Sequence, residues 1–124
     1  MNFCWVTIKV QNMYRSLMFY QDIVGLSLNQ HFHAGGGMEI AFLGSGETQV
    51  ELIKDENSEP FMENYGVSLG FQVSSLDDMM HAVDEKGVKI HSGPFFPNPS
   101  VGFFYVQDPD GFMIQFVEKK TASK

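Results

Sequence analysis

The residues of this chain that could bind a ligand or perform chemistry stand at matching positions of an internal repeat. The pattern of residues 5–12 returns at 68–75, and each half closes on a similar strand, at 49–53 and at 113–117. A repeated unit buries its apolar face by stacking on its copy. Inward positions of the two copies are therefore expected to converge on a shared cavity, and four such positions are Trp5, Glu51, Ser68 and Gln115.

Glu51 is the charged member of this set and has two interpretations. As a functional group, it would anchor a polar or cationic ligand group or act as a general base. As a structural group, it would be a carboxylate satisfied by Ser68, Gln115 or water. Trp5 is likewise either a core aromatic or a stacking platform, and a platform would add cation–π attraction to a cation held by Glu51.

Composition and charge restrict the class of partner. The 124 residues include 15 acidic and 8 basic side chains, a net charge of −7, whereas nucleic-acid binding needs a positive stripe. No apolar run approaches the roughly 18 residues of a membrane span, and the N-terminus lacks the features of a signal peptide. The one cysteine, Cys4, allows no internal disulfide and is interpreted as a core residue. We therefore expect a cytoplasmic protein that binds neither nucleic acid nor a membrane. Its expected partner is a small-molecule ligand, because the inward positions of the repeat are expected to converge on a cavity.

The hydrophobic pattern predicts the element order βαβββ twice. One helix is expected between Asn12, an N-cap residue, and Gly25, a helix stop, and the other from Ser75 to Gly87. A Pro-rich loop is predicted at 93–99 and a turn at 108–111. The predicted strands are 3–10, 27–33, 38–43, 48–54, 67–73, 88–91, 100–107 and 112–118.

Alternation within the strands assigns each side chain to a face. Apolar sets such as Val6, Ile8 and Val10, and Phe104 with Val106, belong beneath the helices. The other face is more polar but still aromatic, as a ligand pocket requires. The residues expected to bind a ligand there are Trp5, Thr7, Glu51, Ser68, Phe103, Tyr105, Met113 and Gln115. Phe95, which forms a Pro-framed pair with Phe96, is expected to belong to a lid over this face.

Two segments carry a resemblance to a known family. These are the helix YRSLMFY at 14–20, followed by Val24-Gly25-Leu26, and the ending VQDPDGFMIQFV at 106–117. They resemble the vicinal oxygen chelate superfamily, which includes glyoxalase I, extradiol dioxygenases and bleomycin-resistance proteins. The resemblance covers residues 3–118. It implies an α+β fold in which paired βαβββ modules form a curved, cavity-lining mixed sheet with helices on the outer face.

The resemblance implies one domain over residues 1–124, with modules at about 3–54 and 67–118 and a linker at 55–66. Enzymes of the superfamily hold a divalent metal through His and Glu or Gln side chains, at positions that correspond here to Trp5, Glu51, Ser68 and Gln115. Glu51 alone matches well, and Gln115 could ligate only weakly through its amide oxygen. We therefore expect no metal ligands and no cofactor, unless Glu51 and Gln115 recruit an unusual histidine.

Three histidines could fill that role, and each also has a structural interpretation. His31 and His33 are two residues apart on a predicted strand, so they share a face. They could pair as ligands or lie on a solvent-exposed surface beside a glycine loop. His91 precedes the Pro-rich loop and could line the mouth of the cavity.

Three functions remain open. The first is a metal-free, dimeric protein of the bleomycin-resistance kind that sequesters an aromatic or cationic small molecule. The second is a metal-dependent lyase, isomerase or dioxygenase of the glyoxalase type. The third is a structural or partner-binding domain whose cavity is filled by its own side chains. The expected homodimer belongs to the first of these, in which Glu51 serves as an anchor or a base.

Overall fold

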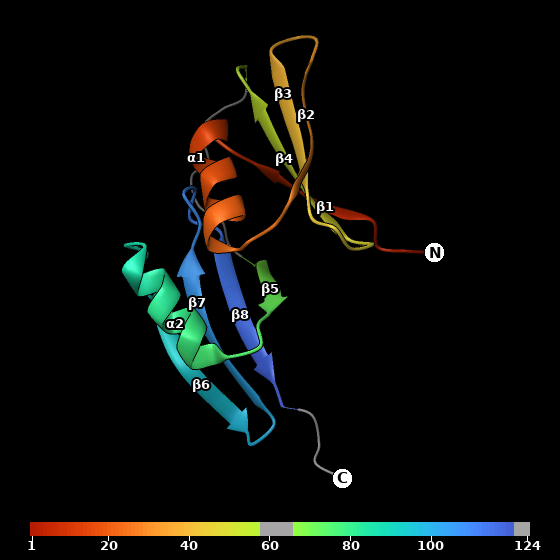
Figure 1. The fold of residues 1–124 in the computed structure, drawn as a ribbon. Coiled ribbons are helices and arrows are strands. Elements are labelled where there is room, and N and C mark those ends of the chain that lie inside the picture. Colours follow the sequence, from red (N-terminus) through yellow and green to blue (C-terminus); the bar gives the residue numbers. More distant parts are fainter. Residues whose placement is uncertain (58–65, 121–124) are drawn as a thin grey trace. The chain divides into compact units, whose positions relative to one another are not determined.

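The computed structural model describes residues 1–57 and 66–120, and the chain divides into two compact units, Met1–Met62 and Glu63–Lys124. Each unit has the element order βαβββ, which confirms the predicted order and the α+β class (Figure 1). Residues 58–65 of the predicted linker lie outside the described residues, and Asp55 belongs to the preceding strand. None of the described helices is long and apolar enough to cross a membrane.

The first unit is a four-stranded mixed sheet with one helical segment. Its strands follow the order β1-β4-β3-β2, with β1 and β4 parallel and the other neighbours antiparallel. A parallel pair requires a long crossover, which the helix and β2–β3 supply. The elements are β1 Trp5–Lys9, α1 Met13–Met18, η1 Phe19–Ile23, β2 Leu28–Ala34, β3 Met38–Leu43 and β4 Gln49–Asp55.

The helix of the first unit begins where the sequence predicts and changes character in its last turn. The Asn12 side chain accepts a hydrogen bond from the backbone N–H of Arg15, 3.0 Å away, as an N-cap residue does. From Phe19 the helix widens into a π-helical turn, in which the Val24 N–H bonds to the Phe19 carbonyl at 3.2 Å. The neighbouring side chains of Phe19 and Tyr20 are both buried in this wider turn.

The core of the first unit lies between the helix and one face of the sheet. Ile8 of β1 and Val10, which follows that strand, are buried there together with Leu52. Thr7, whose side chain points to the opposite face of the sheet, is exposed. This confirms the predicted face assignment. The prediction that Cys4 is a core residue is wrong. β1 begins one residue later, at Trp5, so Cys4 precedes the strand, and it is exposed.

The second unit repeats this architecture with strand order β5-β8-β7-β6, β5 and β8 being parallel. Ser75 caps its helix through a 3.1 Å hydrogen bond from the Asp78 N–H. The predicted turn at 108–111 is present, because the Gly111 N–H bonds to the Asp108 carbonyl at 3.0 Å. The elements are β5 Ser68–Gln72, α2 Leu76–Glu85, β6 Ser92–Asn98, β7 Val101–Gln107 and β8 Met113–Lys119.

The Pro-rich segment is a strand, and the prediction of a strand at 88–91 with a loop at 93–99 is wrong. The strand is β6, at the edge of the second sheet (Figure 1). An edge strand tolerates proline because one side of its backbone needs no partner. Residues Ser92, Phe95 and Asn98 pair with β7, and the register is irregular between them, where Pro94 and Pro97 stand.

Candidate functional site

In the first unit, Thr7, Glu51 and Phe42 lie side by side across three neighbouring strands. Glu51 pairs in register with Thr7 on β1 and with Phe42 on β3, so their side chains share the face opposite the helix. The Thr7 hydroxyl donates a 2.6 Å hydrogen bond to Glu51 Oε1. Glu51 is only 9% exposed, so its carboxylate is held in one position and not spread over many rotamers.

An aromatic pair stands beside this carboxylate. Trp5 lies two residues before Thr7 on β1 and therefore on the same face. Its ring meets Phe42 edge to face, with centroids 5.3 Å apart and planes at 74°. Because Trp5 remains 47% exposed, the contact fixes the indole without burying it. The first unit thus brings together three predicted site residues, Trp5, Thr7 and Glu51, and adds Phe42, which the alternation around buried Ala41 and Leu43 could have indicated.

In the second unit, Gly70, Gln115 and Tyr105 form the corresponding row. Gln115 pairs with Gly70 on β5 and with Tyr105 on β7. Its amide Nε2 donates a 3.1 Å hydrogen bond to the Tyr105 hydroxyl. Its Oε1 lies over Gly70, where an added Cβ would be only 3.1 Å away. Both ends of the Gln115 amide are therefore constrained by the neighbouring strands.

Three aromatic rings surround this row. Phe95, Phe103 and Tyr105 contact one another with centroids 5.6 to 6.4 Å apart, which favours a shared aromatic surface. Phe95 stands on β6 opposite Phe103, so the prediction that it belongs to a lid loop is wrong: it is part of the sheet. Ser68 and Met113, the other predicted site residues of this unit, pair with each other on β5 and β8. That the faces of the two units enclose one cavity stays a prediction.

The histidines do not approach Glu51 within the first unit. His31 pairs with Ala41, which pairs with Leu52, and these belong to the helix-covered face, opposite that of Glu51. His33 shares the face of His31, and their rings are 6.5 Å apart. The His31 Nε2 is 2.5 Å from a Glu39 carboxylate oxygen. In the second unit, His91 is exposed, with its Nδ1 3.2 Å from the hydroxyl of its neighbour Ser92.

The four positions implied for the superfamily's metal do not supply a fitting set of donors. The indole of Trp5 has no ligating lone pair, the Ser68 hydroxyl is a weak neutral donor, and the Gln115 amide is engaged by the neighbouring strands. Glu51 alone is a good ligand type for a divalent metal, which needs three or four protein donors. Across residues 1–57 and 66–120, no group of three or more His, Cys, Asp or Glu residues could hold a metal ion.

The chain belongs to the Glyoxalase/Bleomycin resistance protein/Dioxygenase superfamily, whose family model matches residues 3–116. It is similar to a lactoylglutathione lyase of Neisseria meningitidis serogroup A, with 30% identity over 124 residues covering 92% of this chain and 88% of the relative. The vicinal oxygen chelate resemblance of the sequence is thereby confirmed.

Several solved structures share the fold, among them an enzyme and a binding protein. Glyoxalase I from Zea mays matches with a TM-score of 0.85 at 20% identity; the match covers 97% of this chain but only 45% of the maize chain. TnmS3, an antibiotic binding protein from Streptomyces sp. CB03234, matches with a TM-score of 0.79 at 20% identity, covering 97% of both chains. This chain therefore matches about half of the maize enzyme and nearly the whole length of the antibiotic binding protein.

Proposed function

We propose that this protein binds a small aromatic or cationic molecule without a metal ion. Glu51 would anchor the polar or cationic group, and Trp5 with Phe42 would contact the ring. The observation that carries the proposal is the local arrangement in the first unit: a nearly buried carboxylate, held by Thr7 at 2.6 Å, beside a half-exposed Trp5 ring that contacts Phe42. The aromatic face of the second unit, around Phe103 and Tyr105, would offer a further apolar contact surface.

The physical chemistry of this arrangement favours a cation. Thr7 occupies one oxygen of Glu51, and among the described residues no hydrogen bond is made to the second, which leaves an anionic acceptor for a ligand. A cation over the Trp5 ring would also be attracted by the negative face of the π-system. The net charge of −7 would raise the local concentration of cations around the protein.

A ligand screen tests the proposal. Aromatic cations and neutral aromatics of the same ring size are added to the protein, and the melting temperature is measured. A ligand that binds only the folded state raises stability by mass action, so cations are expected to raise the melting temperature more than their neutral counterparts. Equal responses would contradict a charge anchor, and no response to either class would favour a structural domain.

The second candidate function is a metal-dependent lyase, which the names of relatives such as the Neisseria lactoylglutathione lyase favour. The side chains at the four implied ligand positions predict instead that no metal is bound, because only Glu51 is a good ligand type. We expect purified protein to carry no stoichiometric transition metal, and we expect added Ni²⁺ or Zn²⁺ to give no specific thermal stabilisation. Elemental analysis and thermal melts check this. About one metal per chain, lost on Glu51→Gln, would overturn the binding proposal in favour of the enzyme.

We also propose that the protein forms a homodimer. Within the two sheets, β2 and β6 are edge strands that carry exposed Phe32 and Phe95. Exposed apolar side chains on a sheet edge are a common site of association, because pairing removes them from water. Light scattering at tens of micromolar is expected to give twice the mass of the 14.0 kDa chain. A monomer mass at that concentration would contradict the proposal.

A further inference from the structure

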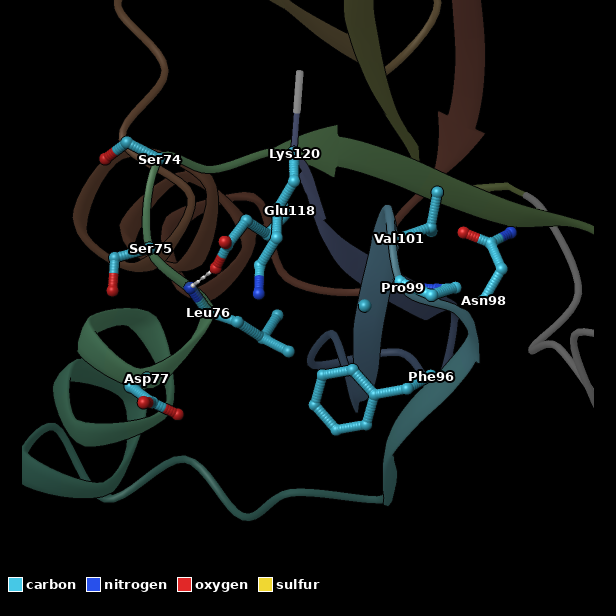
Figure 2. Close-up of a pocket in the computed structure, with 11 residues that line it drawn as sticks. Ser74, Ser75, Leu76, Asp77, Phe96, Asn98, Pro99, Val101, Glu118 and Lys120 are labelled. Atoms are coloured by element: carbon cyan, nitrogen blue, oxygen red, sulfur yellow. Dashed lines mark hydrogen bonds between the residues drawn. The ribbon is translucent and has the colours of Figure 1, made fainter. Parts of the chain in front are cut away.

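A pocket of about 650 Å³ lies in the second unit, on the helix-covered side of its sheet (Figure 2). It is formed where the start of α2, the end of β6, the start of β7 and the end of β8 meet. Gly102, which lines the pocket, lies two residues before buried Phe104 on β7 and therefore on the same face of the sheet. The pocket thus opens on the face opposite Tyr105 and Gln115. It is therefore separate from the row of residues described above.

Phe96 provides the pocket with an aromatic surface. Its side chain is 66% exposed, yet its ring is held in place over the backbone of β7. A Cβ added at Gly102 would lie only 2.6 Å from the Phe96 ring and 3.2 Å from Leu76 Cδ2. The absence of a side chain at Gly102 thus lets the ring rest against β7. Figure 2 shows the side chains of Phe96 and Leu76 lining the same pocket. A fixed and accessible aromatic face is suited to stacking with a planar ligand.

Charged groups of both signs line the same pocket as this ring. Glu118 Oε1 accepts a 2.7 Å hydrogen bond from the Leu76 N–H, which holds the carboxylate at the start of α2. Lys120 follows two residues later, and its backbone N–H bonds to the Ser100 carbonyl at 2.7 Å, so the strand pairing continues beyond β8. Side chains two residues apart on a strand share a face and are roughly 6.6 Å apart at their backbones. The two charges can therefore meet adjacent groups of one ligand.

We propose that this pocket binds a small aromatic zwitterion, such as an aromatic α-amino acid. The ring would stack on Phe96, the ammonium group would lie against Glu118, and the carboxylate would lie against Lys120. The pocket is lined by Glu118, Lys120 and also Asp77. An aromatic anion could pair with Lys120 but would leave Glu118 without a partner group on the ligand, and an aromatic cation could pair with Glu118 but would leave Lys120 without one. A zwitterion satisfies both signs, and complementary charge of this kind decides specificity more than it decides affinity.

The test compares three ligands that share one indole ring. L-Tryptophan, tryptamine and indole-3-propionate are titrated into the full chain while the backbone amide signals are followed by NMR. L-Tryptophan is expected to shift the amides of Leu76 and Gly102 in a saturable manner and to bind about fivefold more tightly than either singly charged analogue. Equal affinity for tryptophan and tryptamine, or no saturable shift at these amides, would overturn the proposal.

Three variants assign the contacts. Lys120→Gln is expected to weaken tryptophan binding about fivefold and to leave tryptamine binding no weaker, because tryptamine has no carboxylate. Glu118→Gln keeps an oxygen that can accept the hydrogen bond of the Leu76 N–H. It is expected to weaken the binding of tryptophan but not that of indole-3-propionate, which has no ammonium group. Lys89→Gln, an exposed lysine outside the pocket, is the matched control and should change neither. Loss of tryptophan binding in that control alone, or retention of full affinity in both pocket variants, would contradict the assignment.

An uncharged substitution separates the ring contact from the charges. Gly102→Ala would place a methyl group against the Phe96 ring and displace it from the sheet. Tryptophan affinity is therefore expected to fall several-fold, while Glu118 and Lys120 are unchanged. Unaltered affinity in a folded Gly102→Ala protein would exclude Phe96 as the stacking partner. The Glu51→Gln substitution is expected to leave tryptophan binding here unchanged, so failure of this proposal and failure of the proposed function can be distinguished.

Discussion

Phe104→Ala is expected to lower the free energy of unfolding by about 3–5 kcal/mol, the usual cost of removing a fully buried phenylalanine side chain. The Phe104 side chain is 0% exposed and packs against Phe116, with ring centroids 5.4 Å apart. The substitution removes this apolar contact and leaves a cavity that the surrounding core can close only in part. Denaturant unfolding monitored by circular dichroism measures the change.

The neighbouring residue is the control for this prediction. Phe103 stands on the opposite face of β7 and is only partly buried. Phe103→Ala is therefore expected to cost about 1–2 kcal/mol, since less apolar surface returns to water and only the ring contacts with Phe95 and Tyr105 are lost. A cost for Phe103→Ala equal to or above that for Phe104→Ala would show that the face assignment is inverted.

Glu51→Gln is expected to weaken the binding of an aromatic cation by about 1–3 kcal/mol, the range of a charge-assisted hydrogen bond. This corresponds to a five- to 150-fold increase in Kd. The amide oxygen of glutamine can still accept the hydrogen bond of Thr7, so the local geometry is preserved while the charge is removed. Binding of a neutral aromatic of the same size is expected to change little. Titration calorimetry with a ligand from the screen measures both.

Two further variants separate the local effect of Glu51 from other causes. Glu47→Gln makes the same change in net charge at an exposed position of the first unit, and it should leave binding unaltered. Trp5→Phe keeps an aromatic ring but weakens the π-face, so a cation should bind about 0.5–1 kcal/mol less tightly. If Glu47→Gln weakens binding as much as Glu51→Gln, the effect is one of overall charge and Glu51 is not the anchor.

The sequence by itself determined the element order and the face on which most side chains lie. Successive residues of a strand point to opposite faces, so the pattern at Ile8 and Val10, or at Phe104 and Phe103, can be read without knowing which strands pair. Asn12 and Ser75 could also be assigned as helix caps from the sequence, because a cap depends on atoms only two or three residues away.

Only the tertiary structure decided which strands lie at an edge and which side chains touch across the sheet. Proline is disfavoured inside a sheet, so β6 became predictable as a strand only once its place at the edge was known. The Thr7–Glu51 and Gln115–Tyr105 hydrogen bonds depend on the register between separate strands, which composition does not encode. The pocket around Phe96 and Glu118 depends in turn on four elements meeting at one end of the second sheet, because no local pattern specifies where distant segments pack.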